Sequence, residues 1–139
     1  MLEKLVYETD ILLLQETKCR EKDRKIKIPG YKVLQKDANH GLAIIISEKI
    51  VPTELNLEQY TSDVIQVQGI NFQSNNQKIN IINVYACNNN LTSVSQWDVL
   101  KNIKDSLDGE VLFCGDFNAR GNSCEILPPT FKEKNWRNG

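Results

Sequence analysis

The sequence has a single histidine and no excess of charge of either sign. Lysine and arginine total 17, aspartate and glutamate total 18, and the formal net charge is -1. This balance excludes a disordered polyelectrolyte and a uniformly basic nucleic-acid binder. A phosphate-bearing ligand would therefore be held locally or through a metal ion.

Long apolar runs and paired cysteines are also lacking. No run approaches the roughly 18 residues of a membrane-spanning helix, and the opening MLEKLVYETD mixes acids with apolar residues. We therefore expect no signal peptide and no membrane partner. The four cysteines form no CxxC pair, which argues against a zinc site and favours reduced thiols. The expected location is intracellular, either nuclear or cytoplasmic.

What is present suffices for one domain. The chain has 139 residues, of which 40% are hydrophobic, and it contains no repeat and no low-complexity tract. We predict a core over residues 1–120. Residues 121–139 have no clear period and are predicted to form an irregular tail.

Apolar patterning predicts strands between two helices. Leu2, Leu5 and Val6 suggest the end of an amphipathic helix that closes near Glu8 or Thr9. The expected strands are ILLL (11–14), YKVLQ (31–35), GLAIIIS (41–47), a region around IVPTEL (50–55), DVIQVQGINFQ (63–73), KINIINVYA (78–86) and VLFCG (111–115). SNNQ (74–77) predicts a turn, so residues 64–86 should form a hairpin.

A second helix is predicted before the last strand. Thr92 or Ser93 can cap it, and it should run to about Leu107. Its buried face is expected to consist of Val94, Trp97, Leu100, Ile103 and Lys104. The order of elements indicates an α/β fold with mixed, largely antiparallel sheets flanked by helices.

Three apolar strands end in polar residues. ILLL leads into Gln15 and Glu16, INIINV leads into Tyr85 and Asn88, and VLFCG leads into Asp116 and Asn118. If these ends meet at one edge, they place two carboxylates, a phenol and two amides around one cleft. Such oxygen ligands suit Mg²⁺ or Mn²⁺, which a substrate phosphate would complete.

Each residue alone also has a plain structural interpretation. Glu16 after a strand is typical of a solvated loop residue. Asp116 and Asn118 after a glycine are compatible with an Asx turn. The recurrence of polar groups after three apolar runs is what favours a site.

The motifs at the two ends of this pattern resemble those of the endonuclease/exonuclease/phosphatase superfamily. DILLLQETKCRE (10–21) is similar to its QET segment, and GDFNAR (115–120) is similar to its GD-x-N segment. GLAIIIS and INIINVYACN stand between them in the superfamily's order. QETKC suits exonuclease III-type abasic-site endonucleases, and GDFNAR suits endonuclease domains of non-LTR retrotransposons.

The resemblance covers roughly residues 1–120 and implies roles for five residues. Glu16 would be the Mg²⁺ ligand, Asp116 would orient and deprotonate the attacking water, and Asn118 would position that water. Tyr85 would help to hold the scissile phosphate, with Asn88 nearby as a substrate-binding residue. The implied fold is a four-layer α/β sandwich.

Several parts of the superfamily pattern are absent. The initial strand with a metal-site Asn and the closing acidic and Ser-Asp-His segments have no counterpart, so the sandwich is expected to be incomplete and the chain truncated. Tyr-x-Pro is replaced by Tyr85, Ala86, Cys87. His40 lies ahead of a strand where the superfamily has a turn, and we do not expect it to be catalytic.

Two further segments keep two interpretations each. The basic run of Lys18, Arg20, Lys22, Arg24, Lys25 and Lys27 either contacts nucleic-acid backbone or, as its interleaved acids favour, forms a solvated loop. LPPTFK (127–132) resembles a Pro-Thr-aromatic segment of phosphatase members, or is a proline-rich surface tail.

The resemblance implies a Mg²⁺-dependent phosphodiester hydrolase of nucleic acid, with DNA as the expected substrate, of retroelement or DNA-repair type. The missing segments would impair it. A phosphatase of the same superfamily and a non-catalytic remnant or binding module are the alternatives. Exposed sheet edges would favour self-association.

Overall fold

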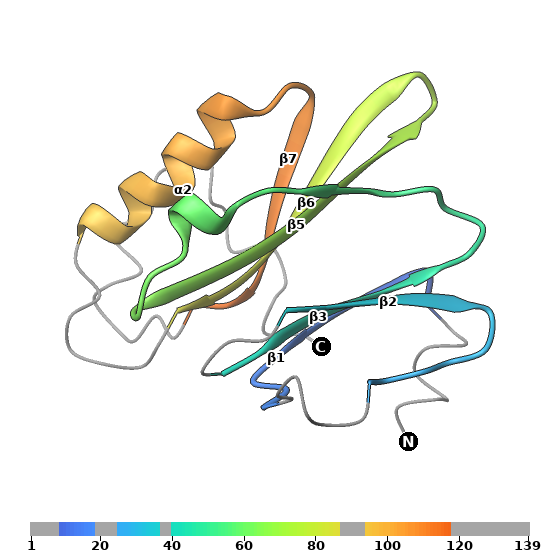
Figure 1. Ribbon diagram of the computed structural model, residues 1–139. Coiled ribbons are helices and arrows are strands. Elements are labelled where there is room, and N and C mark those ends of the chain that lie inside the picture. The colour runs from blue at the N-terminus through green and yellow to red at the C-terminus, as the bar shows by residue number, and fades with distance from the viewer. Residues whose placement is uncertain (1–8, 19–24, 37–39, 87–93, 118–139) are drawn as a thin grey trace.

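The chain forms two β-sheets with a helix on one of them (Figure 1). The computed structural model describes residues 9–18, 25–36, 40–86 and 94–117. Its elements are β1 (Ile11–Gln15), β2 (Tyr31–Lys36), β3 (Leu42–Ser47), β4 (Thr53–Leu55), a short 3-10 helix (Glu58–Tyr60), β5 (Ile65–Ser74), β6 (Gln77–Ala86), α2 (Val94–Ser106) and β7 (Glu110–Asp116).

Sheet A consists of β1, β3 and β2 in that order, and both pairings are antiparallel. The central strand β3 is the apolar run LAIII followed by a serine, and all six of its residues are buried. A continuous apolar run of this length suits a strand covered on both faces. Because β3 lies between β1 and β2, it fixes the position of the end of β1.

Sheet B has the order β4, β5, β6, β7. The hairpin of β5 and β6 turns at Asn75 and Asn76, whose φ angles are 52° and 62°. Asparagine tolerates this left-handed conformation, which a two-residue hairpin turn of type I′ requires. β7 pairs with β6 in parallel after the crossover through α2, so β6 and β7 end at the same edge.

The two sheets pack face to face, and α2 covers the far side of sheet B (Figure 1). Between the sheets lie the side chains of Leu34, Ile44, Ile46 and Ile70. Between sheet B and α2 lies a second apolar cluster of Leu57, Ile65, Val67, Ile82, Val84, Leu100 and Ile103. On the outer face of sheet A, Ile26 and Ile28 cover Ile45.

Polar side chains also join the two sheets. Lys36 of β2 donates hydrogen bonds of 2.9 Å to the Thr61 hydroxyl and to the Val67 carbonyl, and it pairs with Glu58 at 3.1 Å. Gln68 donates its side-chain amide to the Leu34 carbonyl at 2.9 Å. These bonds satisfy polar groups near the sandwich interior and hold the β2 side of sheet A against β5.

The architecture confirms the predicted fold class, a partial α/β sandwich with mixed and antiparallel sheets. The predicted strands, the hairpin and the second helix are all present. Lys104 was wrongly assigned to the buried face of α2, since it is exposed while Leu100 and Ile103 are fully buried. Among the described residues, no helix is long and apolar enough to cross a membrane.

Several predictions fall outside the described residues. They are the first helix, the cap at Thr92 or Ser93, the division at residue 120 between core and tail, the LPPTFK segment (127–132), and the roles of Asn88 and Asn118. All of them stay predictions.

Candidate active site

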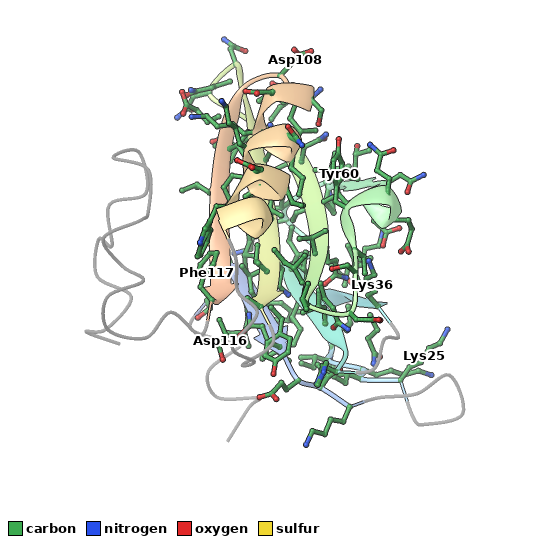
Figure 2. All side chains as sticks on the ribbon, turned by 90° about the vertical axis from the view of Figure 1, so that its left-hand side faces the viewer. Lys25, Lys36, Tyr60, Asp108, Asp116 and Phe117 are labelled. Carbon is green, nitrogen blue, oxygen red and sulfur yellow. The ribbon has the colours of Figure 1, made fainter. Side chains whose placement is uncertain are left out.

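Three strand ends meet at one end of the sandwich. Glu16 directly follows β1, Tyr85 is the penultimate residue of β6, and Asp116 is the last residue of β7. β1 contacts both β6 and β7 across the two sheets. Figure 2 shows Asp116 and Phe117 at the lower end of β7, whereas Asp108, which precedes the strand, lies at the top of the view.

Glu16 and Tyr85 are joined directly. The Tyr85 hydroxyl donates a hydrogen bond of 2.8 Å to Oε1 of Glu16, although the two residues are 69 positions apart in the chain. Tyr85 is buried, with 5% of its surface exposed, whereas Glu16 is exposed. The bond aims the carboxylate while leaving it accessible to a ligand.

Asp116 lies beside Tyr85 in sheet B. The parallel register of β6 and β7 pairs these two residues, so their side chains project from the same face of the sheet. Neighbouring strands are about 4.8 Å apart. Gly115 allows this close pairing: its φ is +145°, and a Cβ there would collide with the Val84 carbonyl. The glycine before the acid therefore has a structural reason.

The turn that carries Glu16 has an unusual backbone. Glu16 and Lys18 have φ angles of 52° and 53°, in the left-handed region that residues other than glycine seldom adopt. Two hydrogen bonds tie the turn to the residues before β3: Thr17 N–H to the Gly41 carbonyl at 3.3 Å and Lys18 N–H to the His40 carbonyl at 2.8 Å. These contacts keep the turn in its conformation.

Asn83, on β6 of the opposite sheet, fixes the end of β1 by hydrogen bonds. It is fully buried on β6 and accepts a hydrogen bond of 2.7 Å from the Gln15 amide. Its own amide donates to the carbonyls of Leu14 at 3.0 Å and Ala43 at 3.3 Å. One side chain thus joins β6 to both β1 and β3, one residue before Glu16.

Sequence reasoning missed the role of Asn83. INIINV was interpreted as an apolar strand, and the polar residue within it was passed over. The signal was available, because alternation places residues 83 and 85 on the same face and a buried amide needs partners.

His40 also lies at this site, which the sequence did not indicate. Its ring packs on the Tyr85 ring with centroids 5.0 Å apart and planes inclined by 44°. Only its position before β3 was visible in the sequence. The neighbour that brings it to the site is 45 residues away.

Two of the five predicted site residues cannot be placed. Asn88 and Asn118 lie outside the described residues. Of the remaining three, Glu16 and Tyr85 are bonded and Asp116 is adjacent to Tyr85. The roles assigned to all five stay predictions.

The oxygen atoms at these strand ends fit a hard divalent cation in one of its two usual modes. No group of three or more acidic, histidine or cysteine side chains gathers within the described part of the chain, so a closed protein cage is not formed there. Mg²⁺ commonly takes only one or two carboxylates and completes its shell with waters and substrate phosphate. Glu16, which is bonded to Tyr85, and Asp116, which pairs with Tyr85 in the sheet, suit that open mode.

Cys114 lies on β7 next to Asn83 in the register of sheet B. It is a free, half-buried cysteine. Burial raises the pKa of its thiol above the usual value, because a thiolate is poorly solvated there. At neutral pH it is a protonated, weakly nucleophilic group rather than a reactive one.

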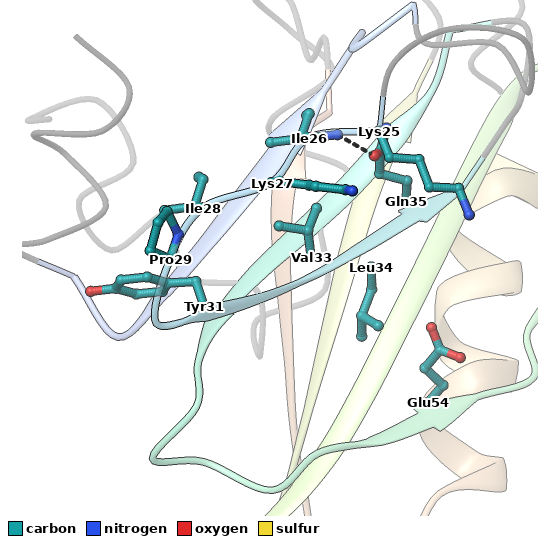
Figure 3. A pocket seen from close by; sticks show the side chains of 10 residues that line it. All are labelled: Lys25, Ile26, Lys27, Ile28, Pro29, Tyr31, Val33, Leu34, Gln35 and Glu54. Atoms are coloured by element: carbon teal, nitrogen blue, oxygen red, sulfur yellow. Dashed lines mark hydrogen bonds between the residues drawn. The ribbon is translucent and has the colours of Figure 1, made fainter.

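A separate hollow lies over β2 (Figure 3). Lys25 and Lys27 line it together with Tyr31 and Gln35, and the Gln35 side chain accepts a hydrogen bond of 2.8 Å from the Ile26 amide. Both lysines are exposed, as expected for the basic run. Among the described residues that line this hollow, Glu16, Tyr85 and Asp116 are not included.

The sequence matches the profile of the Endonuclease/Exonuclease/phosphatase family over residues 1–138. The chain belongs to this family. The predicted resemblance is therefore confirmed on nearly the whole chain. Among curated proteins, no relative matches the sequence significantly.

Solved structures of the Endonuclease/Exonuclease/phosphatase fold are similar at low identity. TDP2 from D. rerio, complexed with a single-strand DNA product, is 17% identical with a TM-score of 0.58, and the match covers 88% of this chain and 53% of that one. The endonuclease domain of TRAS1, a telomere-specific non-LTR retrotransposon, is 18% identical with a TM-score of 0.56 over 86% of this chain and 53% of that one.

A family protein from Leptotrichia buccalis is 16% identical with a TM-score of 0.62, over 90% of this chain and 62% of that one. At such identities the likeness shows the fold. The chain spans about half the length of the D. rerio and retrotransposon structures. This agrees with the expected partial sandwich.

Proposed function

We propose that this protein hydrolyses phosphodiester bonds of nucleic acid with Mg²⁺ or Mn²⁺. The observation that carries the proposal is the hydrogen bond of 2.8 Å between Tyr85 and Glu16, with Asp116 beside Tyr85 in the sheet. It unites three strand ends that are distant in sequence. Their chemistry is that of a metal-assisted hydrolase: carboxylates for a cation and a base, and a phenol for a phosphate oxygen.

Glu16 would hold the cation. When bound there, the cation would neutralise the charge that grows on the phosphoryl oxygens. Glu16 is suited to this role because it is exposed and Tyr85 orients it through a single oxygen. Within the described part of the chain, the second carboxylate oxygen of Glu16 accepts no hydrogen bond.

Asp116 would act on the attacking water. Its carboxylate would accept a hydrogen bond from the water and take its proton as the water oxygen attacks phosphorus. The bond between phosphorus and the leaving ester oxygen would break, and that oxygen would take a proton from solvent. We further propose that Asn118 positions the water. Once the cation holds Glu16, the single O–H of Tyr85 would turn from that carboxylate to a non-bridging phosphate oxygen, and Asn88 would contact the substrate nearby.

DNA is the proposed substrate class. Two structures with the same fold support it, one with a single-strand DNA product and one that is an endonuclease domain. A phosphomonoesterase of the same family is the enzymatic alternative, and a binding module without turnover is the other. The free thiol of Cys114 is in keeping with the proposed intracellular location.

Nicking of supercoiled DNA tests the proposal. The purified chain is incubated with plasmid, intact or carrying abasic sites, in Mg²⁺, in Mn²⁺ and in chelator. The matched control is Asp116→Asn, which keeps the shape and removes the base. We expect metal-dependent nicking that falls by about 10²- to 10⁴-fold in the control.

The other outcomes separate the alternatives. Release of phosphate from a monoester by a chain that leaves DNA intact would favour the phosphatase. DNA binding by a folded chain whose slow background nicking is the same in Asp116→Asn would favour the binding module. In either case the proposed hydrolysis of nucleic acid would be wrong.

Self-association through sheet edges is a further part of the proposal. Among the described residues, β1 is an edge strand of sheet A and β7 is an edge strand of sheet B. Both strands end at the candidate site. An edge strand can add a strand from another chain. Concentration-dependent mass in sedimentation would support association, and a monomer at all concentrations would contradict it.

A further inference from the structure

The only histidine of the chain lies against the site's tyrosine. The rings of His40 and Tyr85 have centroids 5.0 Å apart. The Tyr85 hydroxyl in turn meets Glu16. The imidazole therefore packs against the same ring whose hydroxyl contacts Glu16.

The backbone holds His40 in this place. Its carbonyl accepts the hydrogen bond of 2.8 Å from Lys18 N–H, in the turn that carries Glu16. The next residue, Gly41, has a φ of +83°, and a Cβ there would collide with the Thr17 hydroxyl. The turn after β1 and the turn before β3 are therefore packed against each other, which fixes the backbone of His40 relative to that of Glu16.

The His40 ring is available to a ligand. Its side chain is half-buried, and none of the described residues hydrogen-bonds to a ring nitrogen. An imidazole always carries at least one N–H donor, and donors of this kind bind anionic oxygens strongly when water is partly excluded. Packing on Tyr85 accounts for the ring face and leaves the nitrogen edge unused.

We propose that His40 is a phosphate-contacting residue. One ring N–H would donate a hydrogen bond to a non-bridging oxygen of the substrate phosphodiester, next to the oxygen that Tyr85 contacts. The inference rests on the proposed function for the kind of substrate. By this inference, the single histidine of the chain lies at the site and serves it.

NMR tests the contact directly. Because there is a single histidine, ¹⁵N-histidine labelling gives one pair of ring nitrogen signals that needs no assignment. The labelled chain is titrated with a short single-stranded oligonucleotide in Ca²⁺, a hard cation that replaces Mg²⁺. The matched ligand is the same oligonucleotide with uncharged methylphosphonate linkages. We expect the ring nitrogen signals to shift with the phosphodiester and to stay in place with the methylphosphonate.

Variants separate a phosphate contact from simple ring packing. His40→Phe keeps a ring on Tyr85 and removes the donor, whereas His40→Asn keeps an N–H and removes the ring. We expect about tenfold weaker oligonucleotide binding for His40→Phe and partial recovery for His40→Asn. Gln73→Ala, at an exposed position near the hairpin turn, is the control and should bind as the parent does.

The inference is overturned if His40→Phe binds as tightly as the parent, or if the ring nitrogens respond equally to both ligands. Its failure differs from failure of the proposed function. A chain that binds with the expected ring shift and never nicks DNA would refute the hydrolysis and keep the contact. A chain that nicks DNA with unshifted ring nitrogens would do the reverse.

Discussion

Two asparagines of β6 are equally buried but hydrogen-bond to different parts of the molecule. Asn80 and Asn83 are both 0% exposed, and they project from opposite faces of the same strand. Asn80 donates to the carbonyls of Asp108 at 2.6 Å and Glu110 at 3.0 Å, on the side of α2. Asn83 faces sheet A and joins it to β6 beneath Glu16.

The contrast shows how position gives a structural residue a functional consequence. Asn80 fastens the turn between α2 and β7, at the end of the sheet far from the site. Its side-chain oxygen is buried and meets no hydrogen-bond partner among the residues that the structure describes. Asn83 uses both its oxygen and its nitrogen, and it fixes the strand that presents Glu16, the carboxylate proposed to hold the cation. The same substitution at the two positions should therefore separate stability from activity.

The largest effect is expected for Asn83→Ala. It leaves the Gln15 amide and two backbone carbonyls without their partner, which should lower the free energy of unfolding by about 3 kcal/mol. Nicking by the protein that remains folded should fall at least tenfold, since β1 is no longer held against β6. Urea denaturation and nicking assays measure the two effects. Undiminished nicking would show that β1 needs no such tie.

Asn80→Ala is the matched comparison and should cost less. Two hydrogen bonds are lost, but an unsatisfied buried oxygen is removed with them, so we expect about 1–2 kcal/mol of destabilisation. Nicking per folded molecule should stay within twofold of the parent. A large loss of nicking in this variant would erase the distinction between the two asparagines.

A double-mutant cycle sharpens the account of Asn83. Gln15→Leu and Asn83→Leu each remove the hydrogen bond between these two side chains, and the double variant loses that same single bond. We expect a coupling energy of about 1 kcal/mol in the free energy of unfolding. Additive effects would mean that Asn83 acts only through the carbonyls of Leu14 and Ala43. Denaturation curves of all four proteins provide the numbers.

The smallest effect is expected at Cys114, which pairs in register with Asn83. With Cys19, Cys87 and Cys124 replaced by serine, alkylation reports on Cys114 alone. Its pKa is raised by burial, so alkylation should be slow at neutral pH and accelerate only above the usual thiol range. Asn83→Ala should loosen the site, lower that pKa towards normal and raise the rate a few-fold. Asn80→Ala should leave the rate unchanged.

Much of this fold was readable from local patterns. The run LAIII predicted the central strand, and SNNQ predicted the hairpin turn, because both signals lie within a few residues. Lys104 was wrongly placed in the core because helical spacing alone does not show where a buried stripe ends. The sequence predicted that Glu16, Tyr85 and Asp116 would meet if their strands ended at one edge. In the structure Glu16 follows a strand of sheet A, and it meets Tyr85 of sheet B because the two sheets pack face to face.

The supporting contacts were not predictable in the same way. The ring of His40 meets Tyr85 only after two sheets have packed, and no period in the sequence records that distance. The ties from Asn83 to Leu14 and Ala43 depend on the register between sheets. A sequence reports alternation within a strand, whereas it does not report which strand of the opposite sheet a side chain meets.

The left-handed turn at Glu16 and Lys18 has a consequence for the protein under selection. Each such residue stores about 1–2 kcal/mol of strain that glycine would relieve. Glycine at position 16 would also delete the carboxylate. Random libraries screened for heat resistance alone should therefore accumulate glycine at both positions. The most heat-resistant variants would then lack the Glu16 carboxylate. A second screen for nicking would be needed to retain that carboxylate.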